Sequence, residues 1–216
     1  MYENVWKRNV QVAAAADLVE QRADLIFGMR AAQGEKPARE QQQPRIGVPK
    51  ALLTHSLYPL YRTFLSGLGM DVVLSGLDPR GELKSYSGFC FPAQTAHGAI
   101  LDLARQGVDL VFLPLVKRMP KPGPCRDSHL CPITQASPYF LAKAYPQIHL
   151  LSPLLDFSDG YAACSALVEL AVNELGQTRE LAEREWTAAV RAQTDAEREL
   201  EQLGKKLNNF ILAVER

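Results

Sequence analysis

The residues of this sequence best suited to binding a metal are its four cysteines, Cys90, Cys125, Cys131 and Cys164. Two of them stand close to prolines: Cys90 lies two residues before Pro92, and Cys131 directly precedes Pro132. Proline is common in the first turn of a helix, where the helix dipole and free backbone N–H groups favour a thiolate. Iron–sulfur clusters are held by thiolates in such surroundings. The sequence therefore predicts that Cys90 and Cys131 are a pair of metal ligands.

Two further residues are candidates for the same site. Cys125 lies six residues before Cys131 in a loop rich in proline and glycine (KPGPCRDSHLC), which is long enough to fold over a cluster, so Cys125 is the candidate third ligand. His97 follows Cys90 by about two helical turns and is a candidate donor to a cluster sulfide or a substrate. Against these assignments, the chain lacks the CxxC spacing of ferredoxins and zinc ribbons, and cysteines often pack as small buried hydrophobes. Cys164 is assigned to the core for that reason.

No sequence motif indicates a nucleotide site or a hydrolase. The chain has no Walker A loop and no GxGxxG after a strand, and it has neither HExxH nor GxSxG. A thiol enzyme with Cys90 as nucleophile and His97 as base stays open as an alternative. Whether the chain is an enzyme at all is left open.

The charge balance argues against polyanionic partners. Lys plus Arg equals Asp plus Glu at 24 each, so we expect neither nucleic-acid binding nor attraction to a membrane surface. No apolar stretch approaches the roughly 20 residues needed to cross a bilayer, and the N-terminus lacks the order of a signal peptide. We expect a cytoplasmic protein whose cysteines are thiols or metal ligands rather than disulfides.

Short apolar runs alternate with helical patterns from Arg45 onward, which is typical of a parallel sheet with crossover helices. The predicted strands are residues 45–48, 71–74, 109–113 and 149–151, and the helices between them are expected to end at Gly67–Gly69, to run from Pro92 to Gly107, and to run from about 134 to 144. The loop from Pro114 to Pro132 is expected to follow the third strand. The predicted fold is α/β, a doubly wound parallel sheet.

Helical segments are expected on both sides of this sheet. Residues 1–43 form an N-terminal helix and a polar linker, residues 44–155 the α/β cluster-binding domain, and residues 156–216 C-terminal helices. One C-terminal helix is predicted over 161–175, and a last one is capped by Thr178. The last helix carries an apolar stripe from Leu200 to Val214 without a stop signal, which favours a piece of a longer polypeptide.

Three segments together resemble a known family. RIGVPKALLTHSLYPLYRTFLSGLGMDVVLSG (45–76), FCFPAQTAHGAILDLARQGVDLVFLP (89–114) and CPITQASPYFL (131–141) are similar to the domain that accompanies the ATPase module in activators of 2-hydroxyacyl-CoA dehydratase. The similarity extends over about residues 18–175. Its most specific pieces are IGVPKALL, CFPxxxxHG and CPxxQ.

The resemblance implies a flavodoxin-like fold and an iron–sulfur role in low-potential electron transfer, in anaerobic metabolism. By position, Cys90 and Cys131 match the cysteines of the family motifs, whereas Cys125 lies outside them. The implied cofactor is a 4Fe-4S or double-cubane cluster. The implied partners are an ATPase activator module or a dehydratase-like subunit, with acyl-CoA as a candidate ligand and a homo-oligomer left open. The alternative is a non-catalytic interaction module of a larger activator.

Overall fold

The computed structural model describes residues 18–28, 43–84, 90–121 and 123–214. Its centre is a parallel sheet of four strands in the order β2-β1-β3-β5, formed by β1 (Arg45–Val48), β2 (Asp71–Leu74), β3 (Leu110–Phe112) and β5 (Leu150–Leu151). The mixed α/β class, the parallel sheet and the four predicted strand positions are confirmed.

Two of these strands continue further than the sequence predicted. A second, two-stranded parallel sheet pairs β4 (Leu115–Arg118) with β6 (Leu154–Asp156), where the sequence had predicted a loop after Pro114 and helix after Pro153. The ladder runs on across both prolines, because the Leu113 N–H donates to Leu151 O at 2.9 Å and the Leu115 N–H to Pro153 O at 3.0 Å. Neither bond requires the N–H that proline lacks, so neither proline ends its strand.

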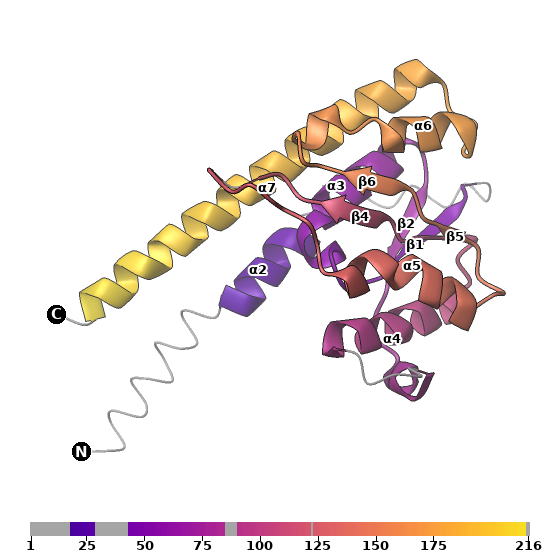
Figure 1. Cartoon of the computed structure of the whole chain (residues 1–216), viewed down its shortest axis with the longest axis horizontal. Coiled ribbons are helices and arrows are strands. Elements are labelled where there is room, and N and C mark those ends of the chain that lie inside the picture. The colour runs from indigo at the N-terminus through magenta and orange to yellow at the C-terminus, as the bar shows by residue number, and fades with distance from the viewer. Residues whose placement is uncertain (1–17, 29–42, 85–89, 122, 215–216) are drawn as a thin grey trace.

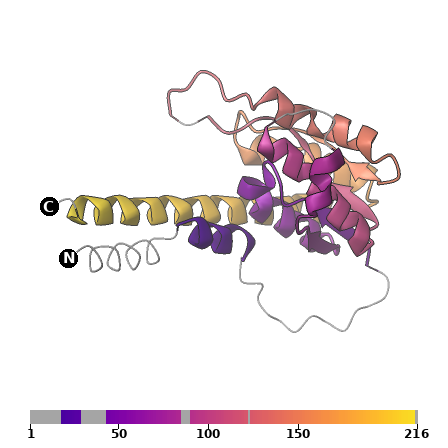
Figure 2. The ribbon, with the colours of Figure 1, turned by 90° about the horizontal axis from the view of Figure 1, so that it is seen from below.

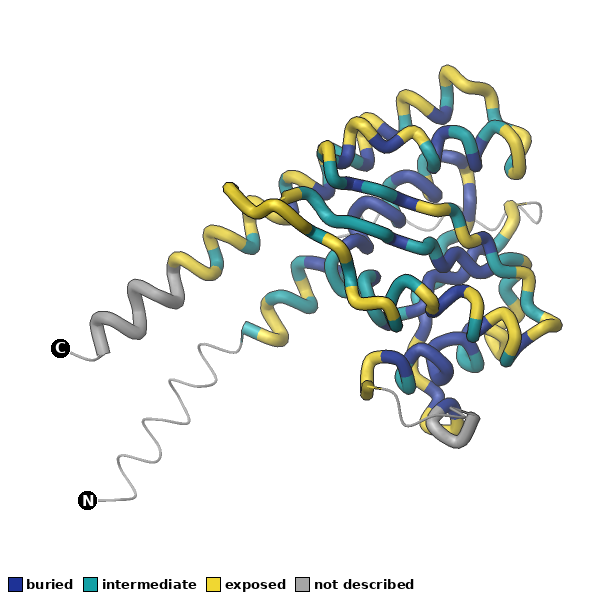
Figure 3. The backbone as a smooth tube through the Cα atoms, in the orientation of Figure 1, coloured by how far each residue is buried: buried dark blue, intermediate teal, exposed yellow. Residues whose placement is uncertain are grey.

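Different helices cover the two faces of the main sheet (Figure 1). Ile46 and Phe112 belong to a core with α3 (Thr54–Gly67), α6 (Ala166–Asn173) and α7 (Arg179–Val214). Val111 belongs to a second core with α4 (Phe91–Gln106) and α5 (Pro132–Ala144). Neighbouring strand residues point to opposite faces, so both faces of the sheet are buried, as Figure 3 also shows.

The helices agree with the sequence prediction except after Pro153. Gly107 ends α4 with φ 65°, and the hydroxyl of Thr178 accepts the Leu181 N–H at 3.3 Å at the start of α7. The predicted helix over 161–175 is instead a short 3-10 turn, η2 (Tyr161–Ala163), followed by α6. Cys164 separates the two with extended backbone and is 7% exposed in the core, so its assignment to the core is confirmed.

Two helices at the ends of the chain project from this body side by side (Figures 1 and 2). They are α7 and α2 (Leu18–Phe27). The rest of the predicted N-terminal helix and linker falls largely within 1–17 and 29–42, and the side chains of the apolar stripe from residue 206 onward also lie outside the described residues. No described helix combines the length and apolar character that a membrane span needs.

Pro59 inside α3 explains how α2 and α7 attach to the body. Proline has no N–H to give to the carbonyl four residues earlier, here His55 O, and Arg22 of α2 donates to that oxygen at 2.7 Å. The side-chain amide of Gln193 on α7 joins the next turn, donating to Ser56 O at 3.0 Å and accepting the Leu60 N–H at 3.3 Å. The carbonyl freed by the proline is thus the docking point for α2, and the adjacent turn of α3 is the docking point for α7.

We expect the Gln193→Leu substitution to lower the free energy of unfolding by about 1–3 kcal/mol, because Ser56 O and the Leu60 N–H would lose their hydrogen bonds to the Gln193 amide. Chemical denaturation measures the change. Gln202→Leu is the matched control, since Gln202 is an exposed residue of the same helix, and we expect it to change stability by less than about 0.5 kcal/mol. Equal effects of the two substitutions would contradict the docking role of Gln193.

Candidate functional site

Cys90 and Cys131 each occupy the cap position of a helix, as the sequence predicted. Cys90 precedes α4 with φ −60° and ψ 152°, and Cys131 precedes α5 with φ −50° and ψ 132°. Each helix has proline in its first turn. Both cysteines are exposed and have free thiols, so both are accessible to a ligand at a helix start.

The two helices that carry these cysteines lie side by side (Figure 1). The rings of His97 on α4 and Phe140 on α5 stack at 5.9 Å between centroids. Nδ1 of His97 also lies 3.2 Å from the hydroxyl of Tyr145, the residue that follows α5. His97 is about 10 Å along α4 from Cys90, and Phe140 is about 13 Å along α5 from Cys131. Both helices follow strands of the parallel sheet in the chain, the arrangement in which helix starts lie on the carboxyl side of a sheet.

His97 is therefore part of the contact that holds α4 against α5. It is 6% exposed, and burial raises the pKa of its partner Tyr145 to about 12, which keeps the phenol protonated. The tyrosine hydroxyl also lies within hydrogen-bond reach of His97 O at 3.3 Å. The prediction that His97 serves a cluster or substrate stays a prediction.

The glycine of the same CFPxxxxHG motif has a steric role. A Cβ on Gly98 would lie 2.5 Å from Asp78 O, and a Cβ on Gly81 would lie 2.1 Å from Gly98 N. These two glycines let the 3-10 helix η1 (Pro79–Lys84) touch the backbone of α4. The buried carboxylate of Asp78 also binds Arg105 of α4, at 2.6 Å. Sequence reasoning missed this support, although the HG pair signals a close approach.

Cys131 is attached to a hairpin that extends from β4. Arg118 pairs with His129 in an antiparallel bridge, and the Leu130 N–H donates to Lys117 O at 3.1 Å. Cys125 lies beyond these contacts in the loop between β4 and α5 and is exposed; Figure 3 shows much of this loop as exposed. Among the residues that the structure describes, no three His, Cys, Asp or Glu side chains are grouped to hold a metal ion. Cys125 as third ligand stays a prediction.

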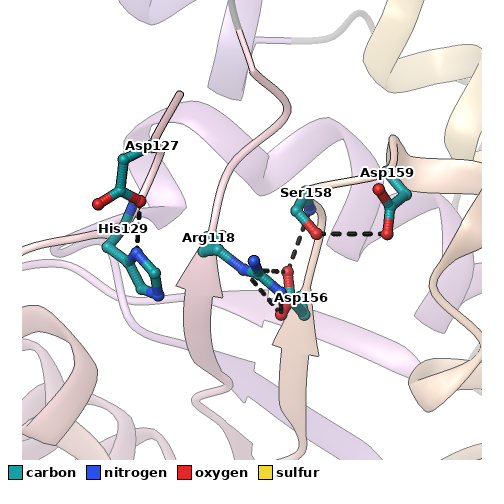
Figure 4. A network of polar contacts seen from close by, with 6 residues as sticks. All are labelled: Arg118, Asp127, His129, Asp156, Ser158 and Asp159. Carbon is teal, nitrogen blue, oxygen red and sulfur yellow. Dashed lines mark hydrogen bonds and ion pairs between the residues drawn. The ribbon is translucent and has the colours of Figure 1, made fainter. Parts of the chain in front are cut away.

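A network of charged side chains anchors the base of this hairpin (Figure 4). Arg118 at the end of β4 donates through Nε to both carboxylate oxygens of Asp156 at 3.0 Å. This contact holds the pKa of Asp156 well below its usual range and raises that of Arg118. In the loop, the ring of His129 contacts Asp127 and lowers the pKa of that carboxyl. Sequence reasoning missed the Arg118 and Asp156 pair because it treated both segments as non-strand.

We expect Asp156→Asn to lower the free energy of unfolding by about 1 kcal/mol at pH 7. A carboxyl whose pKa is depressed on folding stabilises the fold above its unfolded value, 3.8, and the contribution is lost as the pH falls toward the depressed value. The difference from the parent should thus shrink below pH 3.8. Denaturation at several pH values measures it, with Asp24→Asn on the exposed side of α2 as control. A difference independent of pH would refute this account.

A small pocket lies at the same edge, where α3 and α5 leave the sheet toward opposite faces. Ligands of open parallel sheets bind at such points. Its volume is about 10 Å³, at the lower limit of what holds one water molecule and too small for a substrate. Leu52 in its wall has φ 53°, a left-handed conformation that costs about 1–2 kcal/mol. The pocket is therefore not a substrate site.

The chain matches the model of a known protein family. The family model described as the CoA enzyme activase uncharacterised domain matches residues 45–215, which includes the sheet, both cysteine-bearing helices and all of α7. No curated protein matches the chain, and no solved structure matches it either. This agrees with the family resemblance predicted from the IGVPKALL, CFPxxxxHG and CPxxQ segments. The chain belongs to the family of CoA enzyme activase domains.

Proposed function

We propose that this activator-related domain binds an iron–sulfur cluster through Cys90 and Cys131 and takes part in low-potential electron transfer. The observation that supports the proposal is that two exposed thiols stand at the starts of two helices that pack against each other. We also propose that the sheet is flavodoxin-like. A flavodoxin-like strand order begins 2-1-3-4, and the main sheet has this order when β5 is counted as its fourth strand, because β4 belongs to the second sheet.

The donor set fits part of a cluster. A 4Fe-4S cubane commonly takes four thiolates, and Cys90 and Cys131 would supply two of them. We propose that the other positions are filled by Cys125 or by groups of a partner, an ATPase module or a dehydratase-like subunit, as the activase family suggests. A bound cluster supplies a one-electron carrier. The helix starts at Cys90 and Cys131 favour the negative charge of the thiolates, and the contact of His97 with Phe140 holds the two helices together.

Anaerobic reconstitution with iron, sulfide and a small thiol that can take the remaining positions tests this proposal. We expect bound iron and sulfide, a broad charge-transfer absorption and a paramagnetic signal after reduction. A chain that binds no iron but self-associates, and that loses self-association when truncated after Gly176, would instead support the non-catalytic interaction module. Rapid alkylation of Cys90 alone, again without iron, would support the thiol enzyme.

A further inference from the structure

Gln135 holds the backbone on both sides of the Cys131 α-carbon. Its side-chain Nε2 donates to Leu130 O at 2.7 Å, and its backbone N–H donates to Cys131 O at 3.1 Å. The N–H of Leu130 is itself bonded to Lys117 O at 3.1 Å. The residue before Cys131 is thus fixed through both of its peptide groups, and the carbonyl of Cys131 is fixed as well.

This contact differs from an ordinary helix cap. In a capping box, the Glu or Gln at the third helical position accepts the N–H of the cap residue. Gln135 is at the fourth helical position after Cys131, and its amide donates to a carbonyl that precedes the cap. A carboxylate cannot make this bond, because it has no proton to donate at neutral pH.

The bond also separates Cys131 from an exposed loop. The loop from 121 to 127, apart from residue 122, is exposed throughout its described part. At its base, two backbone hydrogen bonds join the two sides of the loop: Met119 N–H to Ser128 O, and Leu130 N–H to Lys117 O. Loops of this kind open locally at low cost. Without the Gln135 amide, motion of the loop would be passed to the peptide that carries Cys131.

We propose that Gln135 is a positioning residue that sets the direction of the Cys131 thiol relative to Cys90. This positioning role rests on the proposed cluster function, whereas the hydrogen bond from Gln135 to Leu130 O does not. The glutamine of the CPxxQ segment then has a defined role, because its amide donor keeps the second cysteine in register with the first.

Three substitutions of Gln135 distinguish its role as hydrogen-bond donor to Leu130 O from a general role in stabilising the start of α5. Gln135→Lys keeps a donor but places a positive charge near a helix start, which is unfavourable there. Gln135→Glu removes the donor and suits the helix start, and Gln135→Leu removes the donor alone. Gln106→Leu is the matched control, because the Gln106 side chain donates only to Asp102 near the far end of α4.

Two measurements on the full chain, without iron, report the effect. The first is the exchange rate of the Leu130 amide, which we expect to be about fivefold faster in the Leu and Glu variants, the factor for one ordinary hydrogen bond. The second is cross-linking of Cys90 to Cys131 by dibromobimane, which fluoresces once both arms have reacted, with the linked peptides identified by mass spectrometry. We expect the yield to fall about fivefold in the same two variants, since small misplacements strongly slow such reactions, and to stay near the parent value in Gln135→Lys and Gln106→Leu.

Parent-like exchange and cross-linking in Gln135→Leu or Gln135→Glu would overturn the positioning role and leave the cysteine pair intact. If instead the parent forms no cross-link while exchange at Leu130 follows the donor, the paired-ligand proposal fails and the hold of Gln135 on Leu130 stands. Iron loading of the same variants by reconstitution then shows whether positioning matters for the cluster, and we expect loading to follow the cross-linking yield.

Discussion

After anaerobic reconstitution, the Cys90→Ala, Cys131→Ala double variant is expected to retain less than about a tenth of the iron bound by the parent chain, since loss of thiolate ligands removes the bonds that hold the cluster. Each single variant should bind intermediate or labile iron, because one helix start still offers a thiolate. Metal analysis and the charge-transfer absorption measure the loss.

The other two cysteines of the chain provide the controls for this result. Cys164→Ala should keep parental iron, since Cys164 is 7% exposed and packed in the core. Cys125→Ala decides the third ligand: a loss of iron would place Cys125 in the site, and unchanged iron would leave the remaining positions to a partner. The side chains of Cys90 and Cys131 are both exposed, so the double variant should unfold at the same denaturant concentration as the parent chain. Parental iron in a folded double variant would remove the cluster proposal.

The Gly81→Ala substitution is expected to lower the free energy of unfolding by about 3 kcal/mol. The added Cβ would lie 2.1 Å from Gly98 N and 2.3 Å from Gly98 Cα. Both atoms belong to the backbone of α4, so relief requires η1 to move away from the helix. That movement would also disturb Asp78, whose backbone N–H bonds to Gly98 O at 3.2 Å.

Gly204→Ala is the matched control, with an expected effect of the opposite sign. Gly204 lies inside α7, and the position that an added Cβ would occupy has nothing within 4 Å. Alanine is favoured over glycine within a helix by about 0.5–1 kcal/mol. Chemical denaturation of the two variants against the parent measures both effects. A stable Gly81→Ala variant would show that η1 and α4 are not in backbone contact.

The main features of the fold follow from local sequence signals. Alternating apolar runs define the four strands of the main sheet, and Gly107 and Thr178 define the end of α4 and the start of α7. The helix starts at Cys90 and Cys131 were also predictable, because proline in a first turn acts within a few residues of the chain. These signals depend on neighbouring residues only, so they can be read without knowledge of the tertiary structure.

Other features depend on contacts between distant segments. Pro114 and Pro153 resemble strand ends in the sequence, but the partner strand uses neither missing N–H, so the strands continue as β4 and β6. That continuation carries Cys125 into an exposed loop. The distance between Cys90 and Cys131 is likewise set by how α4 and α5 pack, through His97 and its partners.

The sequence by itself therefore determined which residues stand at helix starts and which strands form the sheet, because short-range periodicity, caps and prolines specify them. Only the tertiary structure decided which of those helices are neighbours, what His97 contacts, and that Gln135 holds the peptide before Cys131. The physical reason is that a hydrogen bond or a ring contact between segments depends on the packing of whole helices on the sheet, which no local pattern encodes.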